Sequence, residues 1–110
     1  MQKLKENPTL ADFQKHIKDM CIERGWDKNS HLEIFLLFTE EVGELAKAIR
    51  NKTELYAEDK KTIKHQELED ELADVFNYLL DLANYFDIDL ETAYRNKDKK
   101  NSERIWKSKQ

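Results

Sequence analysis

The sequence contains few of the residues on which turns and cross-links depend. Its 110 residues include only two Gly, one Pro and one Cys. Because Gly and Pro dominate turns, this shortage argues against an all-β or loop-rich protein. A single cysteine, Cys21, also excludes a framework of intramolecular disulfides. The absences together favour a structure of long helices.

Long apolar segments are absent as well. No apolar run approaches the roughly 20 residues that a membrane-spanning helix needs. The first ten residues, MQKLKENPTL, contain no apolar stretch of the kind found in signal peptides. We therefore expect a cytoplasmic protein without a membrane partner. With 39% hydrophobic and 38% charged residues, the chain should build only a thin core, which favours self-association.

Charge is distributed unevenly along the chain. Residues 95–110 contain seven Lys or Arg and two acidic residues, a net charge of +5, so residues 1–94 carry −9 of the total −4. Duplex nucleic acid favours a broad basic face, and we expect no nucleic-acid partner. An acidic body and a basic end suit a site that holds metal on carboxylates and phosphate on cations. The alternative is that the cations only complement the dipole of a last helix.

Start and stop signals predict an all-α, four-helix-bundle-like domain. Thr9, Ser30 and Asp89 are expected N-caps, and Glu33 completes a capping box with Ser30. Residues 1–8 are interpreted as an N-terminal arm and residues 9–110 as a single domain. Residues 52–62 are read as a loop or a frayed helical extension. With boundaries approximate, the predicted helices are 10–24, 31 to about 51, about 63 to 86, and 90 to about 107.

Several acidic side chains fall where apolar residues are expected. On a helical wheel of about 100° per residue, Glu41 lies within the apolar arc of the second helix and Glu44 at its edge. Glu71 lies at the boundary of the apolar arc of the third helix, with Asp74 beside it. If the two helices pack by their apolar faces, these four carboxylates converge. Without a counterion they would repel one another, and Mg²⁺ prefers such oxygen ligands.

The acids and the site chemistry have alternative interpretations. Acids at a solvated helix edge, partnered by lysines, would explain Glu40 well but Glu41 poorly. A di-iron bundle would need Glu-x-x-His pairs, and zinc would need Cys and His clusters, all of which are absent. No phosphate-binding loop, dinucleotide-binding turn or HExxH motif occurs. Cys21 is interpreted as a core residue.

The acidic segments resemble a known family. Glu40–Leu45 and Glu71–Asp74 form an EExxE…ExxD pattern, which is similar to that of the MazG-like all-α nucleoside triphosphate pyrophosphohydrolases. The resemblance spans roughly residues 10 to 106. Further matching features are the turn Arg24–Trp26, Tyr78 after the second acidic motif, Ile88–Glu91, and the series Lys97-x3-Asn101-x2-Arg104.

The resemblance implies a role for each matching residue. Tyr78 and Trp26 resemble aromatics that contact base or sugar, with packing as the alternative. Glu40 lies outside the expected metal cluster, where it would have a supporting role. Lys97, Asn101 and Arg104 share one face of the last predicted helix and resemble phosphate and sugar contacts. The residues that resemble the catalytic Mg²⁺ ligands of the family, with Mn²⁺ as an alternative metal, are Glu41, Glu44, Glu71 and Asp74.

The implied activity is Mg²⁺-dependent hydrolysis of (d)NTPs to (d)NMPs and pyrophosphate. Water activated by the metal would attack the α-phosphorus, in a nucleotide-pool housekeeping role. The family also implies a homodimer or homotetramer. Two alternatives stay open: a non-catalytic helical interaction or regulatory module that retains the bundle, and a phosphohydrolase that releases orthophosphate. Some relatives carry a second tryptophan where this chain has Arg50 and Asn51, which departs from the dCTP-preferring type.

Overall fold

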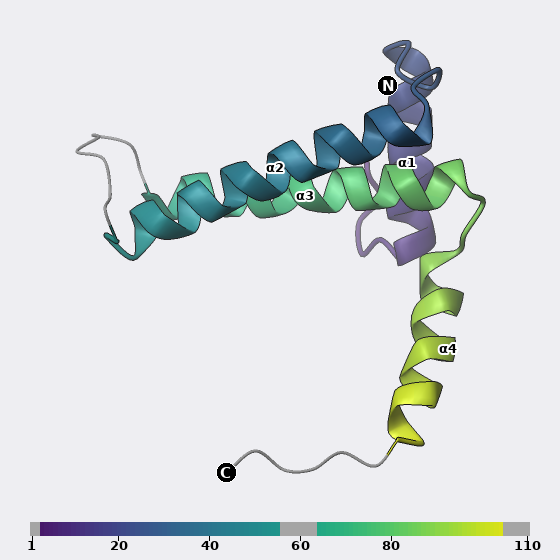
Figure 1. Cartoon of the computed structure of the whole chain (residues 1–110). Helices are drawn as coiled ribbons and strands as arrows, with labels where there is room; N and C mark the ends of the chain where they lie inside the picture. Colours follow the sequence, from purple (N-terminus) through teal and green to yellow (C-terminus); the bar gives the residue numbers. More distant parts are fainter. Residues whose placement is uncertain (1–2, 56–63, 105–110) are drawn as a thin grey trace.

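The computed structural model describes residues 3–55 and 64–104 (Figure 1). Its four helices confirm the predicted all-α class, and the described residues contain no strand. None of these helices combines the length and the apolar character that a membrane crossing requires. The helices are α1 (Leu10–Glu23), α2 (His31–Lys52), α3 (Lys64–Tyr85) and α4 (Leu90–Ser102).

The predicted caps begin three of the helices. Thr9 opens α1, where its side chain accepts a hydrogen bond from the backbone of Asp12 and the Asp12 carboxylate accepts one from the backbone of Thr9. Ser30 and Glu33 form the same reciprocal box at α2. The Asp89 side chain caps α4. Each cap satisfies backbone N–H groups that have no partner within the helix.

Two helix ends have a local cause. After α1, Gly25 takes a φ of +74°, the left-handed conformation that commonly follows a helix. The last helix, α4, ends at Ser102, earlier than the predicted boundary near Lys107, and Glu103 forms its C-cap. Arg104 therefore lies beyond the helix. Residues 56–63 and 105–110 lie outside the described residues, and they include most of the connection predicted at 52–62.

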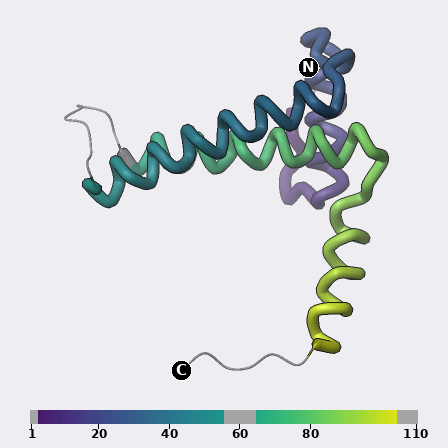
Figure 2. Tube along the Cα trace, viewed as in Figure 1, coloured from purple at the N-terminus to yellow at the C-terminus, as the bar shows by residue number. Residues whose placement is uncertain are grey.

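The first three helices form the body of the molecule. Helix α2 packs antiparallel along α3, and α1 packs against the C-terminal half of α3 (Figures 1 and 2). At the second of these contacts, the rings of Phe13 and Phe76 meet edge to face with their centroids 5.4 Å apart. Ile17, Cys21 and Leu80 form the buried cluster beneath them. The interior is thin, as expected: the buried apolar side chains of the described residues are Ile17, Cys21, Ile34, Ala48, Leu80 and Ala83.

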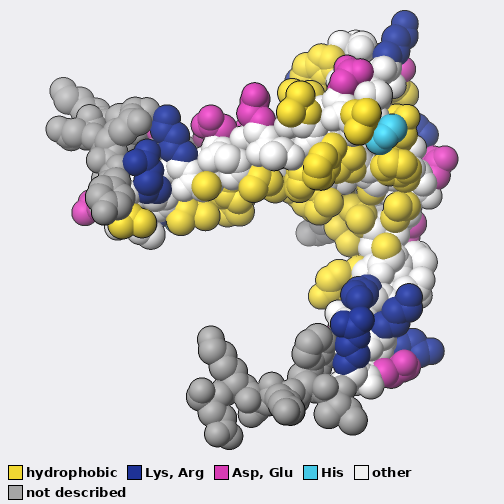
Figure 3. Space-filling model, viewed as in Figure 1, with side chains coloured by type: hydrophobic (Ala, Val, Ile, Leu, Met, Phe, Trp, Pro, Cys, Tyr) yellow, Lys and Arg dark blue, Asp and Glu magenta, His cyan; other side chains and the backbone are white. Residues whose placement is uncertain are grey.

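Much of the apolar surface of α2 and α3 is exposed (Figure 3). These side chains belong to the apolar arcs of the two helices on the helical wheel. An apolar arc more than about 100° wide exceeds what one neighbouring helix covers. We call this surface the apolar face; it comprises Phe35, Val42, Ile49, Leu72, Leu79 and Phe86.

A hydrogen-bond network around Gln14 and Asn84 sets the direction of α4. The Gln14 amide donates to Asn84 Oδ1 at 3.1 Å and to the carbonyl of Ile88 at 2.8 Å. Its oxygen accepts from the backbone N–H of Leu90 at 3.0 Å. The Asn84 amide donates in return to the carbonyl of Gln14. These bonds hold the start of α4 against α1 and α3, and α4 projects away from the α2–α3 pair (Figure 1).

Candidate metal and nucleotide site

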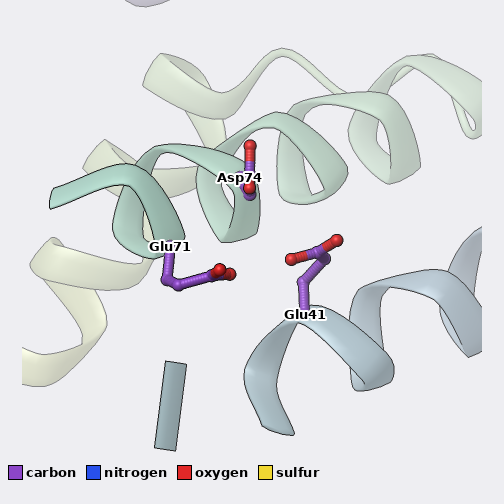
Figure 4. Close-up of side chains that lie close together, drawn as sticks. All are labelled: Glu41, Glu71 and Asp74. Carbon is purple, nitrogen blue, oxygen red and sulfur yellow. The ribbon is translucent and has the colours of Figure 1, made fainter. Parts of the chain in front are cut away.

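Three acidic side chains from α2 and α3 converge, as the wheel predicted. One carboxylate oxygen from each of Glu41, Glu71 and Asp74 lies within 4.8 Å of the others (Figure 4). Glu41 and Glu71 are half-buried and Asp74 is exposed. Asp74 follows Glu71 by three residues, so both project from one face of α3 towards α2. We call these three residues the acid triad.

The carboxylates of the acid triad lie close enough to repel one another when they are ionised. The pKa of Glu71 is raised to about 7, first by burial and then by the hydrogen bond and charge of Glu41 and by the charges of Asp74 and Glu44. One oxygen of Glu71, Oε2, is buried and has no hydrogen-bond partner among the described residues. Convergent carboxylate oxygens with one unpartnered atom fit a hard divalent cation. The triad is therefore a candidate metal site.

Glu44 and Glu40 lie outside the triad. Glu44, the fourth expected ligand, is exposed and lines an adjacent cavity of about 110 Å³ together with Glu71 and the buried Asn51. Its charge still contributes to the raised pKa of Glu71. Glu40 is exposed, in line with the wheel that placed it apart from the metal cluster. The structure thus brings three of the four expected ligands together and leaves Glu44 beside them.

A larger cavity of about 240 Å³ adjoins the triad. Glu41 and Asp74 form part of its wall, and both expected aromatics, Trp26 and Tyr78, line it as well. The pKa of Tyr78 is raised by burial and by the charges of Glu41 and Asp74, which agrees with its place beside the acids. We call this space the triad cavity. It offers aromatic surface next to a candidate metal site, an arrangement that suits a nucleotide.

The structure places the three expected phosphate and sugar contacts elsewhere. Lys97 and Asn101 lie exposed on α4, and Arg104 lies in the bend that follows it, so only the first two share a helix face. Figure 3 shows lysine and arginine side chains gathered on α4, away from the α2–α3 pair. Within one chain, this basic group does not reach the acid triad.

Three charged or amide side chains of the triad cavity were not among the expected site residues: Arg24, Asn77 and Asp81. Asn77 and Asp81 follow Asp74 by three and seven residues, a spacing that keeps them on its face of α3 and could have indicated them. Arg24 had no such signal, because its guanidinium reaches the site by lying over the Trp26 ring, 5.1 Å from the centroid.

Cys21 also lines the triad cavity. It is buried, as its interpretation as a core residue requires, and only 6% of it is exposed. Burial, together with the charge and hydrogen bond of Asp81, raises the pKa of its thiol to about 11. The thiol is therefore a neutral donor rather than a nucleophile near neutral pH.

The comparison with known proteins matches the region of the chain that contains the acid triad. A family model described as the MazG nucleotide pyrophosphohydrolase domain matches residues 29–106. The matched segment contains the whole acid triad and α4. No curated protein matches the chain.

Proposed function

Because the chain belongs to the MazG nucleotide pyrophosphohydrolase domain family, we propose that it hydrolyses (d)NTPs to (d)NMPs and pyrophosphate with Mg²⁺. The observation that carries this proposal is the acid triad beside a cavity lined by Trp26 and Tyr78. A housekeeping role in the nucleotide pool is part of the proposal.

In this proposal the carboxylates hold the cation. Glu41, Glu71 and Asp74 supply oxygens, and Glu44, one turn beyond Glu41, completes the ligand set that the family resemblance implies. Mg²⁺, when bound, neutralises charge on phosphoryl oxygens and lowers the pKa of water. Mn²⁺ is the alternative metal, because it accepts the same oxygen ligands. A carboxylate not engaged by metal would accept the proton of the attacking water.

The cations of the chain bind the phosphates in this proposal. Among the described residues, Arg24 is the basic side chain that lines the triad cavity, and it is placed to pair with a phosphate. Lys97, Asn101 and Arg104 are the further phosphate and sugar contacts. Since α4 projects away from the triad of its own chain, a second copy would have to supply these three residues. The proposed site is therefore shared between subunits of a homodimer or homotetramer.

Two features favour this self-association. The apolar face lies open on α2, on α3 and just after α3, with Leu72 52% exposed and Phe86 54% exposed. The radius of gyration is 17.1 Å, whereas a compact chain of this length has about 13 Å. A second copy packed on the apolar face would bury these side chains and give a compact assembly.

Replacing Leu72 with Glu is expected to convert the protein to a monomer. A charge in the middle of a buried apolar contact loses its hydration without a partner. The wild type should have the mass of a dimer or tetramer by size exclusion with light scattering, and the variant that of one chain. Its pyrophosphohydrolase activity should fall as well, because α4 of another copy is lost. Leu4→Glu, an exposed leucine outside the apolar face, is the matched control; a wild type that is itself monomeric would contradict the shared site.

Product analysis tests the proposed reaction. The purified protein is incubated with a panel of canonical and modified (d)NTPs, with and without Mg²⁺, and the products are separated by chromatography. We expect equal amounts of nucleoside monophosphate and pyrophosphate, formed only when Mg²⁺ is present. Orthophosphate as the released product would instead identify a phosphohydrolase. No turnover, with no Mg²⁺ uptake in calorimetry, would identify a non-catalytic helical module.

A further inference from the structure

The triad cavity is lined by a third carboxylate, Asp81, besides Glu41 and Asp74, and the proposed chemistry does not use it. Asp81 lines this cavity and follows Asp74 by seven residues, two turns of α3, which places it roughly 10 Å further along the helix. Metal–oxygen distances are only about 2.0–2.6 Å, so Asp81 and Asp74 are too far apart to bind one ion. The cavity thus runs from the acid triad, at one end, to a separate carboxylate at the other.

A second cavity continues beyond Asp81. It measures about 220 Å³ and shares Cys21, Trp26 and Asp81 with the triad cavity. Asp81 therefore lies between two adjoining spaces rather than against a closed wall. A ligand that enters from the triad would reach it after passing Tyr78, which lies between Asp74 and Asp81 along α3.

The Asp81 carboxylate forms no ion pair with a residue that the structure describes. Its neighbour in both cavities is Cys21, whose thiol influences the pKa of the carboxyl. Burial raises the pKa of Asp81 and the thiol hydrogen bond lowers it. A carboxylate has about four acceptor positions, and one thiol leaves most of them available. The oxygens of Asp81 are not among the buried unpartnered atoms of the described residues, so their remaining acceptor positions are open to water or to a ligand.

The surroundings of Asp81 suit a flat ring with N–H groups on its edge. Tyr78 and the face of Trp26 that Arg24 does not cover supply aromatic surface against which such a ring can stack. The Asn77 amide offers both a donor and an acceptor. A nucleotide with its phosphates at the triad would extend its base in this direction. The base edge would then face the Asp81 carboxylate.

From this placement, and resting on the proposed function, we infer that Asp81 determines base specificity by accepting a hydrogen bond from the exocyclic amino group of cytosine or adenine. Uracil and thymine carry carbonyl oxygens where cytosine carries its amino group. At that position the carboxylate would meet an oxygen acceptor instead of an N–H donor, and the N3–H of uracil or thymine lies one ring atom away. A site built to accept a hydrogen bond discriminates strongly against an analogue that lacks the donor. The substrates are therefore nucleotides of cytosine or adenine.

The pair dCTP and dUTP tests this inference, because the two differ only in the base edge that Asp81 would meet. In the wild type, kcat/KM should favour dCTP by roughly 10- to 100-fold, the value of a hydrogen bond to a charged group. In Asp81→Asn, the new amide can donate to the uracil carbonyl, and the preference should fall by at least about tenfold. Asp81→Glu retains a carboxylate and should retain the direction of the preference. Asp70→Asn removes an equal charge from an exposed position on the same helix and should leave the ratio unchanged.

A binding measurement separates this inference from the proposed reaction. Calorimetry with dCMP and dUMP on the metal-free protein should show the same preference, and the same loss in Asp81→Asn, without any turnover. If triphosphates are cleaved but dCTP and dUTP are treated alike, the inference is wrong and the proposed function stands. If nothing is cleaved, the proposed function is wrong and the monophosphate titration still decides the role of Asp81. Equal ratios in Asp81→Asn and Asp81→Glu, with both variants folded by circular dichroism, would overturn the assignment.

Discussion

Replacing Glu41 with Gln is expected to abolish Mg²⁺-dependent release of pyrophosphate. The change removes one charged oxygen ligand from the acid triad and leaves an amide of nearly the same shape. Metal ions contribute several kcal/mol to transition states of this kind, and each 1.36 kcal/mol is a factor of ten in rate. We therefore expect kcat/KM to fall by about 10³-fold or more. The measurement is product formation at saturating Mg²⁺ for the wild type and the variant.

The same variant is expected to be more stable than the wild type when metal is absent. Glu41 raises the pKa of Glu71 through its hydrogen bond and its charge, a sign that ionised carboxylates oppose one another in the triad. Removing one charge relieves this repulsion. We expect the free energy of unfolding to rise by on the order of 1 kcal/mol. Urea unfolding in EDTA measures it. Loss of activity together with a gain of stability marks a binding site and distinguishes this result from simple misfolding.

Glu40→Gln is the matched control for this prediction. Glu40 neighbours Glu41 on α2 and carries the same charge, but it is exposed and lies outside the triad. We expect it to lose less than about tenfold in kcat/KM and to show no gain in stability, since exposed charges contribute little. Equal losses in the two variants would contradict the assignment of Glu41 as a metal ligand.

Stability of the metal-free protein is expected to fall as the pH rises towards neutrality, and Mg²⁺ should reverse the fall. The pKa of Glu71 is raised from 4.5 to about 7, so the folded protein holds this proton more tightly than the unfolded chain does. Its contribution is fully present below pH 4.5 and is lost as the pH rises through about 7. A bound cation replaces the proton and removes the repulsion, and its effect should be largest at and above pH 7.

Thermal unfolding in EDTA and in Mg²⁺, across a series of pH values, measures this coupling. Glu71→Gln cannot ionise at this position, so the difference between wild type and variant isolates the Glu71 carboxyl from other titrating groups. The lowered pKa values of Asp12 and Asp89 do not interfere, because their stabilisation is lost only in acid. A pH dependence identical in wild type and Glu71→Gln would show that Glu71 is not the group responsible.

Local features of the fold were predictable because their causes are local. The caps at Thr9, Ser30 and Asp89 form hydrogen bonds to a backbone group three residues away, so each helix start is encoded in a few adjacent residues. The spacing of Glu71 and Asp74 places both on one face of any helix that contains them. The thin core followed from composition. These predictions needed no knowledge of how the helices pack.

The arrangement of the site depended on contacts between distant parts of the chain. Which acids converge is set by how α2 packs on α3, and Glu44 falls outside the triad although its spacing resembles that of its neighbours. The direction of α4 depends on Gln14 and Asn84, which are 70 residues apart in the sequence.

The sequence by itself determined the helices, the acidic faces and the family, because hydrogen bonds and periodicity within one helix act over a few residues. Only the tertiary structure joined Arg24, Trp26 and Asp81 around one cavity and separated Lys97 from the acids of its own chain. The physical reason is that packing selects among faces that a helical wheel shows as equivalent. A neighbouring helix can pack on different parts of an apolar arc that is wider than one helix–helix contact. The helical wheel does not state which part of the arc meets the neighbour.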